Sequence, residues 1–408
     1  MRIALITYDI SPYRGSEASV SWNFVDKMRK YVDITVFYGD TREEVERYLS
    51  GNPMDNVEWV NVPRRWPDHV KSEFIKDIYH VVYYRRWHKD IYRLVKEKVD
   101  NGEIDLIHYL SPIGFKEPGL CWKIKSVPYV WGPVQGVENR PLCMYRAFTF
   151  KGKVLAFGRR LLHNGAFRLI PSVRKAFRRA DAIFAATPGT VRGLKRVHGL
   201  DVMHLPENGI LAMERSTPVA FAQGDTLRLI CIGAIIDRKA LVILLDALRK
   251  VKSDRWHLDV VGDGPLRTVL QARYADLSER VVWHGKVPRD KAQEIFSGAH
   301  LHVLPSLGEG NPTTIWEAMS KGIPTMTLDH CGMSGVVCPR CGIKIPIDGY
   351  ENVTTRMAGE IDDLVNRPER IGELSAGVIE CSRKFMWDNR IGIYRDTYAG
   401  VSRKYKVQ

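Results

Sequence analysis

The sequence predicts an α/β protein with two Rossmann-like domains whose parallel sheets face a central cleft. Apolar, strand-like runs alternate with helical stretches through the first half of the chain, which is typical of a parallel sheet covered by helices on both faces. A stretch without clear periodicity follows, and the same alternation then restarts. The 408 residues are also too many for one ordinary hydrophobic core.

The first half of the chain, residues 1–210, is expected to form the N-terminal domain. Its predicted strands are Ile3–Thr7, Ile34–Tyr38, Val57–Val62, Leu106–Tyr109, Val127–Trp131 and Ala182–Ala186. Its predicted helices are Glu17–Lys30, Arg42–Leu49, Ile78–Lys98, Pro118–Lys125 and Val173–Arg179. The segment from Leu205 to Asp225 reads as the connection between the two domains.

The second domain is expected over residues 211–385. It opens with a strand at Leu227–Ile232, and leucines at 241, 244, 245 and 248 have the spacing of one helix face. Further strands are predicted at Leu258–Val261, Val281–Trp283, Leu301–Leu304 and Pro324–Thr327. Ligands of such sheets lie outside the carboxyl ends of the strands, so loops of both domains are expected to meet in the cleft.

The most informative motif is Glu309-Gly-Asn-Pro-Thr-Thr-Ile-Trp-Glu317. Pro312 suits the first turn of a helix and Asn311 is a favourable N-cap, so a helix is predicted to open there. Free amide groups at its start bind phosphate without a metal. The predicted binding residues are Gly310, Asn311, Pro312, Thr313 and Thr314. The two carboxylates are better suited to accepting hydrogen bonds from sugar hydroxyls.

Glu309 and Glu317, with the flanking Pro305-Ser306 and Ala318-Met-Ser-Lys-Gly-Ile-Pro324, resemble the E-x7-E pattern of retaining GT-B glycosyltransferases of family four, the glycosyl transferases of group 1. The resemblance is to enzymes of the bacterial surface-polysaccharide type. It implies the GT-B fold, a nucleoside-diphosphate-sugar donor and a glycan acceptor. It also implies that residues 386–408 form a helix crossing back to the first domain.

The resemblance places the donor diphosphate at the loop that follows the strand 227–232. Gly233 and Lys239 match the family pattern there, whereas the family arginine is replaced by Ala234. Arg238 is predicted to substitute for that arginine. By the same resemblance, the loop with Lys286 and Val287 contacts the nucleotide base through its backbone.

On the acceptor side, the resemblance points to the loop between the first strand and the first helix. Gly15 matches a family glycine, Ser16 is expected to cap the helix, and Glu17 is expected to point toward the acceptor. Its spacing is not that of a dinucleotide-binding G-x-G-x-x-G loop, which argues against an NAD enzyme. His108 and Gln135, near the ends of the fourth and fifth strands, are also predicted to lie at the cleft.

The expected reaction is sugar transfer from the donor to an acceptor hydroxyl with retained anomeric configuration. Lys239 and Arg238 would stabilise the departing diphosphate. Glu309 would hold the transferred sugar, and Glu317 the ribose. No Asp-x-Asp metal motif is found, so no metal or other cofactor is expected. Double displacement needs a carboxylate nucleophile below the anomeric carbon. Because the resemblance places Glu309 against the sugar hydroxyls instead, front-face substitution is preferred. The alternatives are a GT-B phosphorylase and a basic membrane- or nucleic-acid-binding protein with an inactive cleft.

The net charge of +14 indicates an anionic partner. The segment 157–179 concentrates basic residues among apolar ones, which favours an anionic membrane surface that would bring the enzyme to a lipid-linked acceptor. The basic residues are Arg159, Arg160, Arg168, Arg174, Lys175, Arg178 and Arg179, and the apolar ones are Phe157, Leu161, Leu162, Phe167, Leu169, Ile170 and Phe177. Nucleic acid is not an expected partner, because no recognised binding motif accompanies the charge.

No signal peptide or membrane-spanning run is recognisable, so a cytoplasmic location, peripheral at the inner face of the cell membrane, is expected. The seven cysteines do not indicate a disulfide framework. Cys338 and Cys341 have the spacing of half a zinc site, near Cys331, and Cys381 or His330 would be needed to complete it. Without a second such pair, incidental thiols are the preferred interpretation.

Overall fold

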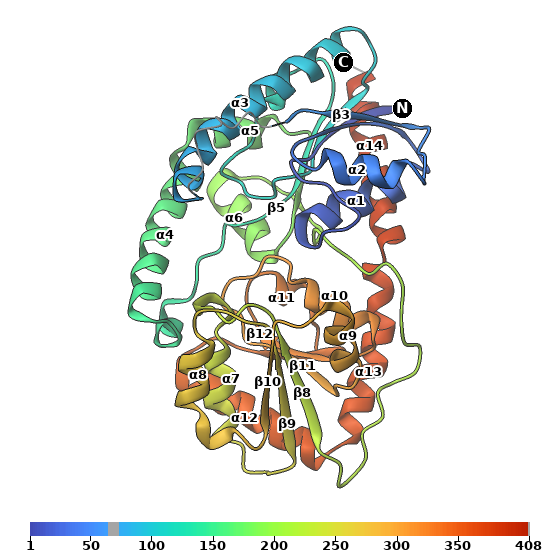
Figure 1. Cartoon of the computed structure of the whole chain (residues 1–408). Helices are drawn as coiled ribbons and strands as arrows, with labels where there is room; N and C mark the ends of the chain where they lie inside the picture. Colours follow the sequence, from blue (N-terminus) through green and yellow to red (C-terminus); the bar gives the residue numbers. More distant parts are fainter. Residues whose placement is uncertain (64–72, 407–408) are drawn as a thin grey trace.

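The structure is a computed structural model that describes residues 1–63 and 73–406. Two open sheets form the centres of two domains, which lie one above the other (Figure 1). All strand pairs within both sheets are parallel. The predicted fold class is confirmed.

The first sheet has the strand order β3-β2-β1-β4-β5-β6-β7. Its strands are β1 (Arg2–Ile6), β2 (Asp33–Tyr38), β3 (Val57–Asn61), β4 (Leu106–Tyr109), β5 (Tyr129–Val134), β6 (Ala182–Ala185) and β7 (Met203–His204). Its helices are α1 (Ser16–Met28), α2 (Arg42–Leu49), α3 (Glu73–Asp100), α4 (Phe150–Leu169), α5 (Pro171–Arg179) and α6 (Pro188–His198). Short 3₁₀ turns lie at η1 (Cys121–Lys123) and η2 (Leu142–Ala147).

The second sheet has the order β10-β9-β8-β11-β12-β13. Its strands are β8 (Leu227–Ile232), β9 (Trp256–Val261), β10 (Val281–Gly285), β11 (Leu301–Leu304), β12 (Thr325–Leu328) and β13 (Gly342–Ile345). The α-helices are α7 (Leu241–Leu248), α8 (Arg267–Arg273), α9 (Arg289–Ser297), α10 (Thr313–Ser320), α11 (Cys331–Val336), α12 (Tyr350–Asn366), α13 (Glu369–Ser382) and α14 (Trp387–Lys406). The 3₁₀ turns are η3 (Asp237–Lys239), η4 (Ala275–Leu277) and η5 (Arg383–Phe385).

One predicted helix is wrong. The segment Pro118–Lys125 contains only the 3₁₀ turn η1, because Gly119 adopts a left-handed φ of 64° that a regular helix does not tolerate. A side chain at this glycine would also collide with His88 and Tyr109. The helices α4 and α6 were not predicted. The fifth strand begins later than predicted and continues to Val134.

Two segments cross between the domains. The last helix, α14, runs back along one edge of the molecule to the first domain (Figure 1), where Trp387, Tyr394 and Tyr398 join the hydrophobic core beside α1. In the opposite direction, Met144 and Phe148 of the first half pack into the core of the second domain. Each domain therefore contains a segment from the other half of the chain, and no single position in the sequence separates the two domains.

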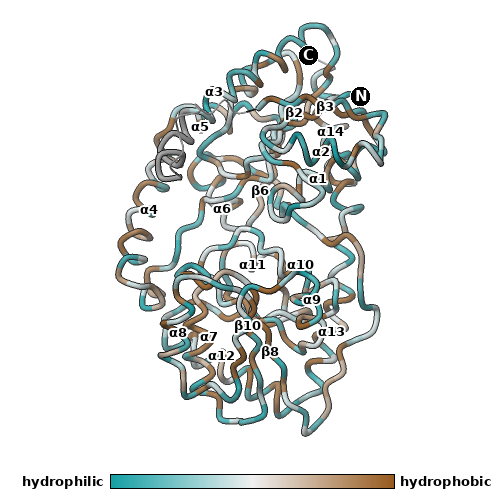
Figure 2. The backbone as a smooth tube through the Cα atoms, viewed as in Figure 1, coloured by the Kyte–Doolittle hydropathy of each residue, from teal (hydrophilic) through white to brown (hydrophobic). Residues whose placement is uncertain are grey.

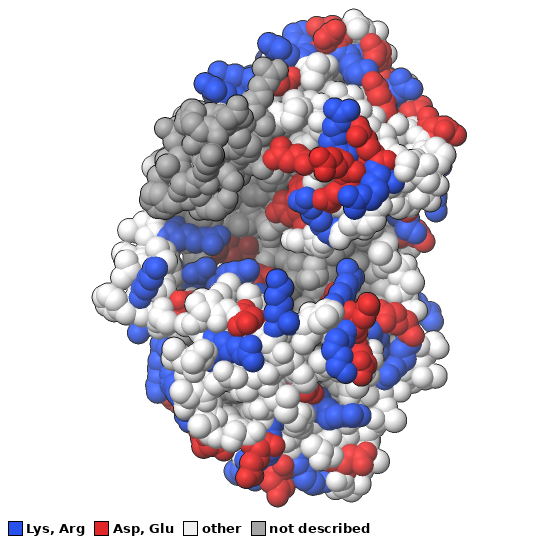
Figure 3. Space-filling model, viewed as in Figure 1, with Lys and Arg blue, Asp and Glu red and all other residues white. Residues whose placement is uncertain are grey.

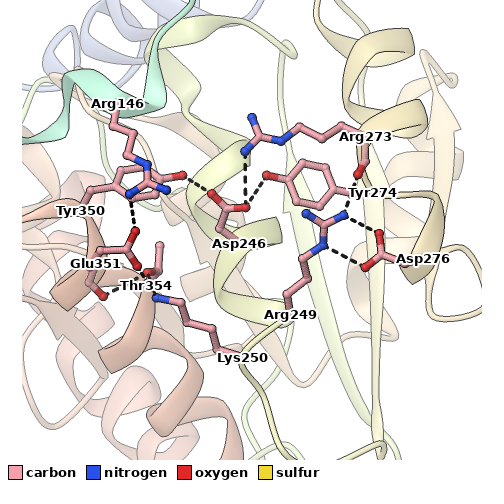
Figure 4. A network of polar contacts seen from close by, with 10 residues as sticks. All are labelled: Arg146, Asp246, Arg249, Lys250, Arg273, Tyr274, Asp276, Tyr350, Glu351 and Thr354. Atoms are coloured by element: carbon pink, nitrogen blue, oxygen red, sulfur yellow. Dashed lines mark hydrogen bonds and ion pairs between the residues drawn. The ribbon is translucent and has the colours of Figure 1, made fainter.

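A polar network strengthens this second crossing (Figure 4). Arg146, within η2, forms an ion pair with Glu351 of α12 and lies over the ring of Tyr350. The hydroxyl groups of Tyr350 and Tyr274 both donate to the carboxylate of Asp246 on α7, each at 2.6 Å. The segment that enters the second domain is thus tied to the helices that cover one face of its sheet.

The helix α4 is exposed on its outer side, where hydrophobic residues alternate with hydrophilic ones (Figure 2). Its exposed apolar side chains are Phe150, Val154, Leu155, Phe157, Leu161, Leu162 and Leu169. By contrast, Phe167 and Phe177, predicted to belong to a membrane surface, are buried in the core of the first domain. In the described part of the chain, no helix is both long enough and apolar enough to span a bilayer.

Candidate functional site

A cavity of about 650 Å³ lies between the two domains, at the loops that follow the parallel strands. It has the size of a small-molecule site. Its walls come from both halves of the chain and from the connection between them. The lining residues used below are Ser16, Glu17, Gln135, Arg140, Arg159, Glu207, Arg238, Glu309, Gly310 and Asn311. Lys and Arg side chains gather along the rim of the second domain that faces this hollow (Figure 3).

Glu309 contacts both predicted phosphate ligands. Lys239 Nζ lies 3.1 Å from Glu309 Oε1, and Arg238 forms an ion pair with the same oxygen. Arg238 also donates to the carbonyl oxygen of Gly308 at 3.2 Å. The structure therefore brings together the three residues predicted to be catalytic, although they come from two loops about 70 positions apart.

Burial and the neighbouring guanidinium of Arg238 lower the pKa of Lys239 to about 8. Its aliphatic stem passes beside Gly233, whose φ of 144° is open only to glycine. A Cβ atom at this position would lie 3.4 Å from Lys239 Cε. This distance is an ordinary van der Waals contact, so the backbone conformation and not the space for Lys239 requires glycine at position 233.

The turn that carries these cations is fastened to the first domain. Asp237, the first residue of η3, accepts hydrogen bonds from the amide of Thr149 at 2.8 Å and from its hydroxyl at 2.9 Å. Thr149 is the N-cap of α4 and also accepts from the amide of Gly152. One carboxylate thus links the start of α4 to the residue that precedes Arg238.

The predicted start of the helix after Glu309 needs a correction. The N-cap of α10 is Pro312, and the side chain of Asn311 does not cap it. Instead, Asn311 Oδ1 accepts a hydrogen bond of 2.6 Å from the indole of Trp316. This side-chain bond holds Asn311 outside the helix, and Thr313 becomes the first helical residue. The amides of the first turn still point out of the helix start.

Gly310 is the point of closest approach between this loop and the first domain. A Cβ atom on Gly310 would fall 1.2 Å from Gln135 Oε1. Gln135 comes directly after β5 and lines the cavity, as predicted from its place in the sequence. A side chain on Gly310 would therefore displace the amide group of Gln135 from its place in the cavity wall.

The predicted donor residues outside this loop lie away from the cavity lining. Glu317 is half-buried on α10, where burial raises the pKa of its carboxyl group, and Gln293 of α9 donates to it. Lys286 is exposed, whereas Val287 packs against the core of the second domain. Pro312, Thr313 and Thr314 belong to the start of α10 behind Asn311.

In the first domain, the loop before α1 differs from the prediction. Gly15, not Ser16, occupies the N-cap position, and Ser16 is the first helical residue with a φ of 58°. The left-handed φ of this non-glycine residue costs conformational energy at the edge of the cavity. Glu17 lines the cavity as expected, and burial together with the carboxylate of Asp9 raises its pKa to about 7.

His108 does not lie in the cavity, so its predicted position at the cleft is wrong. Its ring is fully buried between β4 and α14. Nε2 lies 2.8 Å from the carbonyl oxygen of Gly132, and Nδ1 lies 2.6 Å from the hydroxyl of Tyr398. Both ring nitrogens are satisfied by the fold, because α14 covers the strand at this point.

Sequence reasoning missed several residues of the site. Glu207 follows β7 in the connection to the second domain, and burial, with a smaller contribution from Glu17, raises its pKa well above its usual range. Arg140 lies close to Arg159 and Arg238, so cations of both domains face one cavity. Glu207 and Arg140 lie in loops without a periodic pattern. The only feature of the sequence that could have marked them as site residues is a charged side chain next to a proline or glycine.

Residues 226–365, about a third of the chain, match the family model described as glycosyl transferases group 1. A lipopolysaccharide 1,6-galactosyltransferase of Salmonella typhimurium is 36% identical over 162 residues, which cover 39% of this chain and 41% of the relative. The matched segment thus spans about two fifths of that relative.

Solved structures resemble the chain over almost its whole length. The apo form of the lipopolysaccharide outer core galactosyltransferase WaaB gives a TM-score of 0.68 at 15% identity and covers 98% of this chain and 99% of its own. Anabaena HepE in complex with UDP and glucose gives a TM-score of 0.59 at 12% identity and covers 98% and 100%. These likenesses establish a common two-domain fold, the GT-B fold.

Proposed function

On the premise that residues 226–365 belong to the glycosyl transferases of group 1, we propose that this chain transfers a sugar from a nucleoside-diphosphate-sugar to a hydroxyl of a glycan acceptor. The acceptor is lipid-linked, and the pathway is the assembly of a surface polysaccharide such as O-antigen, capsule or exopolysaccharide. The relatives that match part of the chain support this assignment, since they include a lipopolysaccharide galactosyltransferase and an amylovoran biosynthesis glycosyltransferase.

The observation that carries the proposal is the cluster of Arg238, Lys239 and Glu309, of which Arg238 and Glu309 line the interdomain cavity. Two cations held by one carboxylate form a site for a doubly charged anion, because a diphosphate can replace the carboxylate as their partner. The first-turn amides of α10 start only four residues after Glu309. A diphosphate that reaches from the two cations to this helix start would gain from both.

During transfer, the bond between the anomeric carbon and the diphosphate oxygen breaks while the acceptor oxygen attacks the same carbon. Negative charge grows on the diphosphate, and Lys239 and Arg238 stabilise it electrostatically. The acceptor's proton passes to the departing phosphate oxygen, so the configuration is retained without a covalent intermediate. Lys239 and Arg238 supply the charge that a metal would otherwise provide, which makes the reaction metal-independent.

The carboxylate of Glu309, released from the cations when the diphosphate binds, accepts hydrogen bonds from hydroxyls of the transferred sugar. The acceptor enters from the first domain, past Glu17 and Gln135. With a pKa of about 7, Glu17 is partly protonated at neutral pH and can both donate to and accept from a sugar hydroxyl.

The proposed partner of the outer face of α4 is an anionic membrane, at the cytoplasmic side of the cell membrane. Exposed leucines at 161 and 162 stand beside exposed basic residues of α4 and α5, a combination that suits the interface of a charged bilayer. Arg159 instead lines the cavity. The same helix therefore presents one surface to the lipid and another to the sugar site.

The first test is thermal stabilisation of the protein by UDP, GDP and ADP and by their sugar conjugates, in buffer that contains a Mg²⁺ chelator. A ligand at a hundred times its Kd adds about 2.7 kcal/mol to the free energy of unfolding. A shift in Tm with one nucleotide, lost in Lys239→Ala, is expected. Incubation with that donor and a glycan acceptor, followed by NMR of the fresh product, then gives the anomeric configuration. The absence of any nucleotide-dependent shift would contradict the proposal.

A further inference from the structure

Three cysteines come together outside the lining of the sugar cavity. Cys338 and Cys341 lie in the loop between α11 and β13, and Cys381 lies near the end of α13. Their sulfur atoms are all within 4.8 Å of one another, and those of Cys338 and Cys381 are 3.5 Å apart. A tetrahedral zinc ion with Zn–S bonds of ~2.3 Å separates its sulfur ligands by about 3.8 Å. The three thiols thus already have close to the spacing of a metal site.

The local backbone has the form of a metal-binding turn. In Cys338-Pro-Arg-Cys341-Gly, the amide of Cys338 donates to Cys341 Sγ at 3.2 Å, and the amide of Cys341 donates to the carbonyl oxygen of Cys338 at 3.0 Å. The turn therefore closes on itself and points both sulfur atoms to one side.

The third cysteine is brought to the turn by a close contact with α13. A Cβ atom at Gly377 would lie 1.8 Å from the carbonyl oxygen of Arg340, so the turn rests directly on the backbone of the helix. Cys381 is one helical turn further along the same face. His330, which the sequence also allowed as a ligand, is not part of this group among the described residues.

From this arrangement we infer that Cys338, Cys341 and Cys381 form a structural site for a thiophilic divalent cation, Zn²⁺ above all. Three thiolates and Zn²⁺ carry a net charge of −1, and the guanidinium of Arg340, which also pairs with Glu380 at 2.9 Å, lies 4.0 Å from Cys381 Sγ. Cys338 is only half-buried, so solvent has access to the fourth coordination position. Thiolate sulfur selects zinc over Mg²⁺ and Ca²⁺.

Such a cation would fasten the end of α13 to the loop behind the sugar site. Residue Gly332 of α11 packs against the carbonyl oxygen of Gly310, and η5 and α14 follow directly after α13. The metal would thus connect the end of α13, which leads into the crossing helix α14, with the segment after α11, the helix that packs against the Glu309 loop. This role is separate from sugar transfer and does not depend on the function proposed above.

The test is the metal content of the full chain, purified without chelators and analysed by mass spectrometry of the elements. We expect about one zinc per chain, lost in Cys338→Ser and Cys381→Ser. Cys143→Ser, which removes an exposed thiol elsewhere, should keep the metal. Zinc that persists in both site variants, or a metal-free wild-type protein that also fails to bind added Zn²⁺ or Co²⁺, would overturn the inference.

A second measurement uses only the wild-type protein, in case the variants do not fold. Alkylation of the native protein, read by peptide mapping, should leave Cys338, Cys341 and Cys381 unmodified until a zinc chelator is added, whereas Cys143 reacts in both conditions. Co²⁺ should produce the charge-transfer absorption of a cobalt–thiolate bond. A disulfide between Cys338 and Cys381 in the freshly purified protein, with no bound metal, would show that the three thiols are not a metal site.

Discussion

Lys239 Nζ lies 3.1 Å from Oε1 of Glu309, and the same oxygen is the partner of Arg238. Without a ligand, the carboxylate thus neutralises part of the charge that the diphosphate would meet. Solvent screens this ion pair only weakly, because Lys239 and Glu309 keep only 17% and 12% of their side-chain surface exposed. Binding of the donor is then an exchange of partners within a desolvated site, which leads to distinct expectations for each of the two residues.

Replacement of Lys239 by alanine should lower kcat/KM for the nucleotide-sugar by about ten- to a hundredfold, since a hydrogen bond to a charged group contributes roughly 1.5–3 kcal/mol. Steady-state kinetics with varied donor measures this effect. Lys291→Ala is the matched control, because Lys291 is exposed on α9 and pairs only with Glu294 among the described residues. Equal losses in both variants would remove Lys239 from the donor site.

The pH dependence of kcat/KM gives a separate test of Lys239. Burial and Arg238 lower its pKa to about 8, and only the protonated amine attracts phosphate. Because kcat/KM reports ionisations of the free enzyme, it should fall as pH rises through about 8. In Lys239→Arg the guanidinium stays charged, so this limb should move to higher pH. An unchanged limb in that variant would assign the ionisation to another group.

For Glu309→Gln we expect opposite effects on binding and turnover. UDP should bind as tightly as before or more tightly, because the amide no longer competes with phosphate for Arg238 and Lys239. Turnover should fall by about ten- to a hundredfold through the lost charged hydrogen bonds to the sugar. Calorimetry with UDP and single-turnover kinetics measure the two quantities, with Glu294→Gln as a surface control. Unchanged turnover would show that Glu309 does not hold the transferred sugar.

The arrangement of the sheets and the cluster of Glu309, Arg238 and Lys239 were both accessible from the sequence. The alternation of strands and helices is a local pattern, and the E-x7-E motif with its flanks carries the family likeness. Other features depend on long-range packing, which leaves no periodic signal. Trp316 takes the side chain of Asn311 away from the cap, and α14 buries His108. Glu207 and Arg140 reach the cavity only because the domains close around their loops.

Membrane binding should depend on the apolar face of α4. The double variant Leu161→Ser/Leu162→Ser removes two side chains that are 60% and 72% exposed, and should weaken binding to anionic phospholipid vesicles at least tenfold, because burying one leucine contributes roughly 1.5–3 kcal/mol. Vesicle co-sedimentation at low and high salt measures it. Activity on a water-soluble acceptor should stay unchanged.

The matched control for this surface is Leu211→Ser/Val269→Ser, since both residues are similarly exposed but lie outside α4. It should bind vesicles like the wild-type protein. If both double variants lose the same affinity, the attraction comes from overall charge and hydrophobicity and not from α4. Binding of the wild-type protein to uncharged vesicles with equal affinity would argue against a role for the basic residues.

The last prediction concerns the structural role of His108. The carbonyl oxygen of Gly132 can only accept, so Nε2 of His108 carries the proton, and Nδ1 accepts from the hydroxyl of Tyr398. Burial lowers the pKa of His108 to about 4 from an ordinary value near 6.5. Between these values the unfolded chain binds the proton and the folded chain does not. The contribution of the neutral His108 ring to the free energy of unfolding is therefore fully present above about pH 6.5 and is lost as the pH falls toward 4.

Between pH 7.5 and pH 5, His108 alone should reduce the free energy of unfolding by about 2 kcal/mol, which lowers the apparent Tm of a domain of this size by roughly 4–8 °C. Differential scanning calorimetry at the two pH values measures this loss, and it should shrink in His108→Gln. Tyr398→Phe should cost about 1–3 kcal/mol at pH 7.5, because it leaves the buried Nδ1 without its donor. KM for the donor should not change in Tyr398→Phe. A large change in KM at unaltered Tm would instead indicate that His108 contributes to the sugar site.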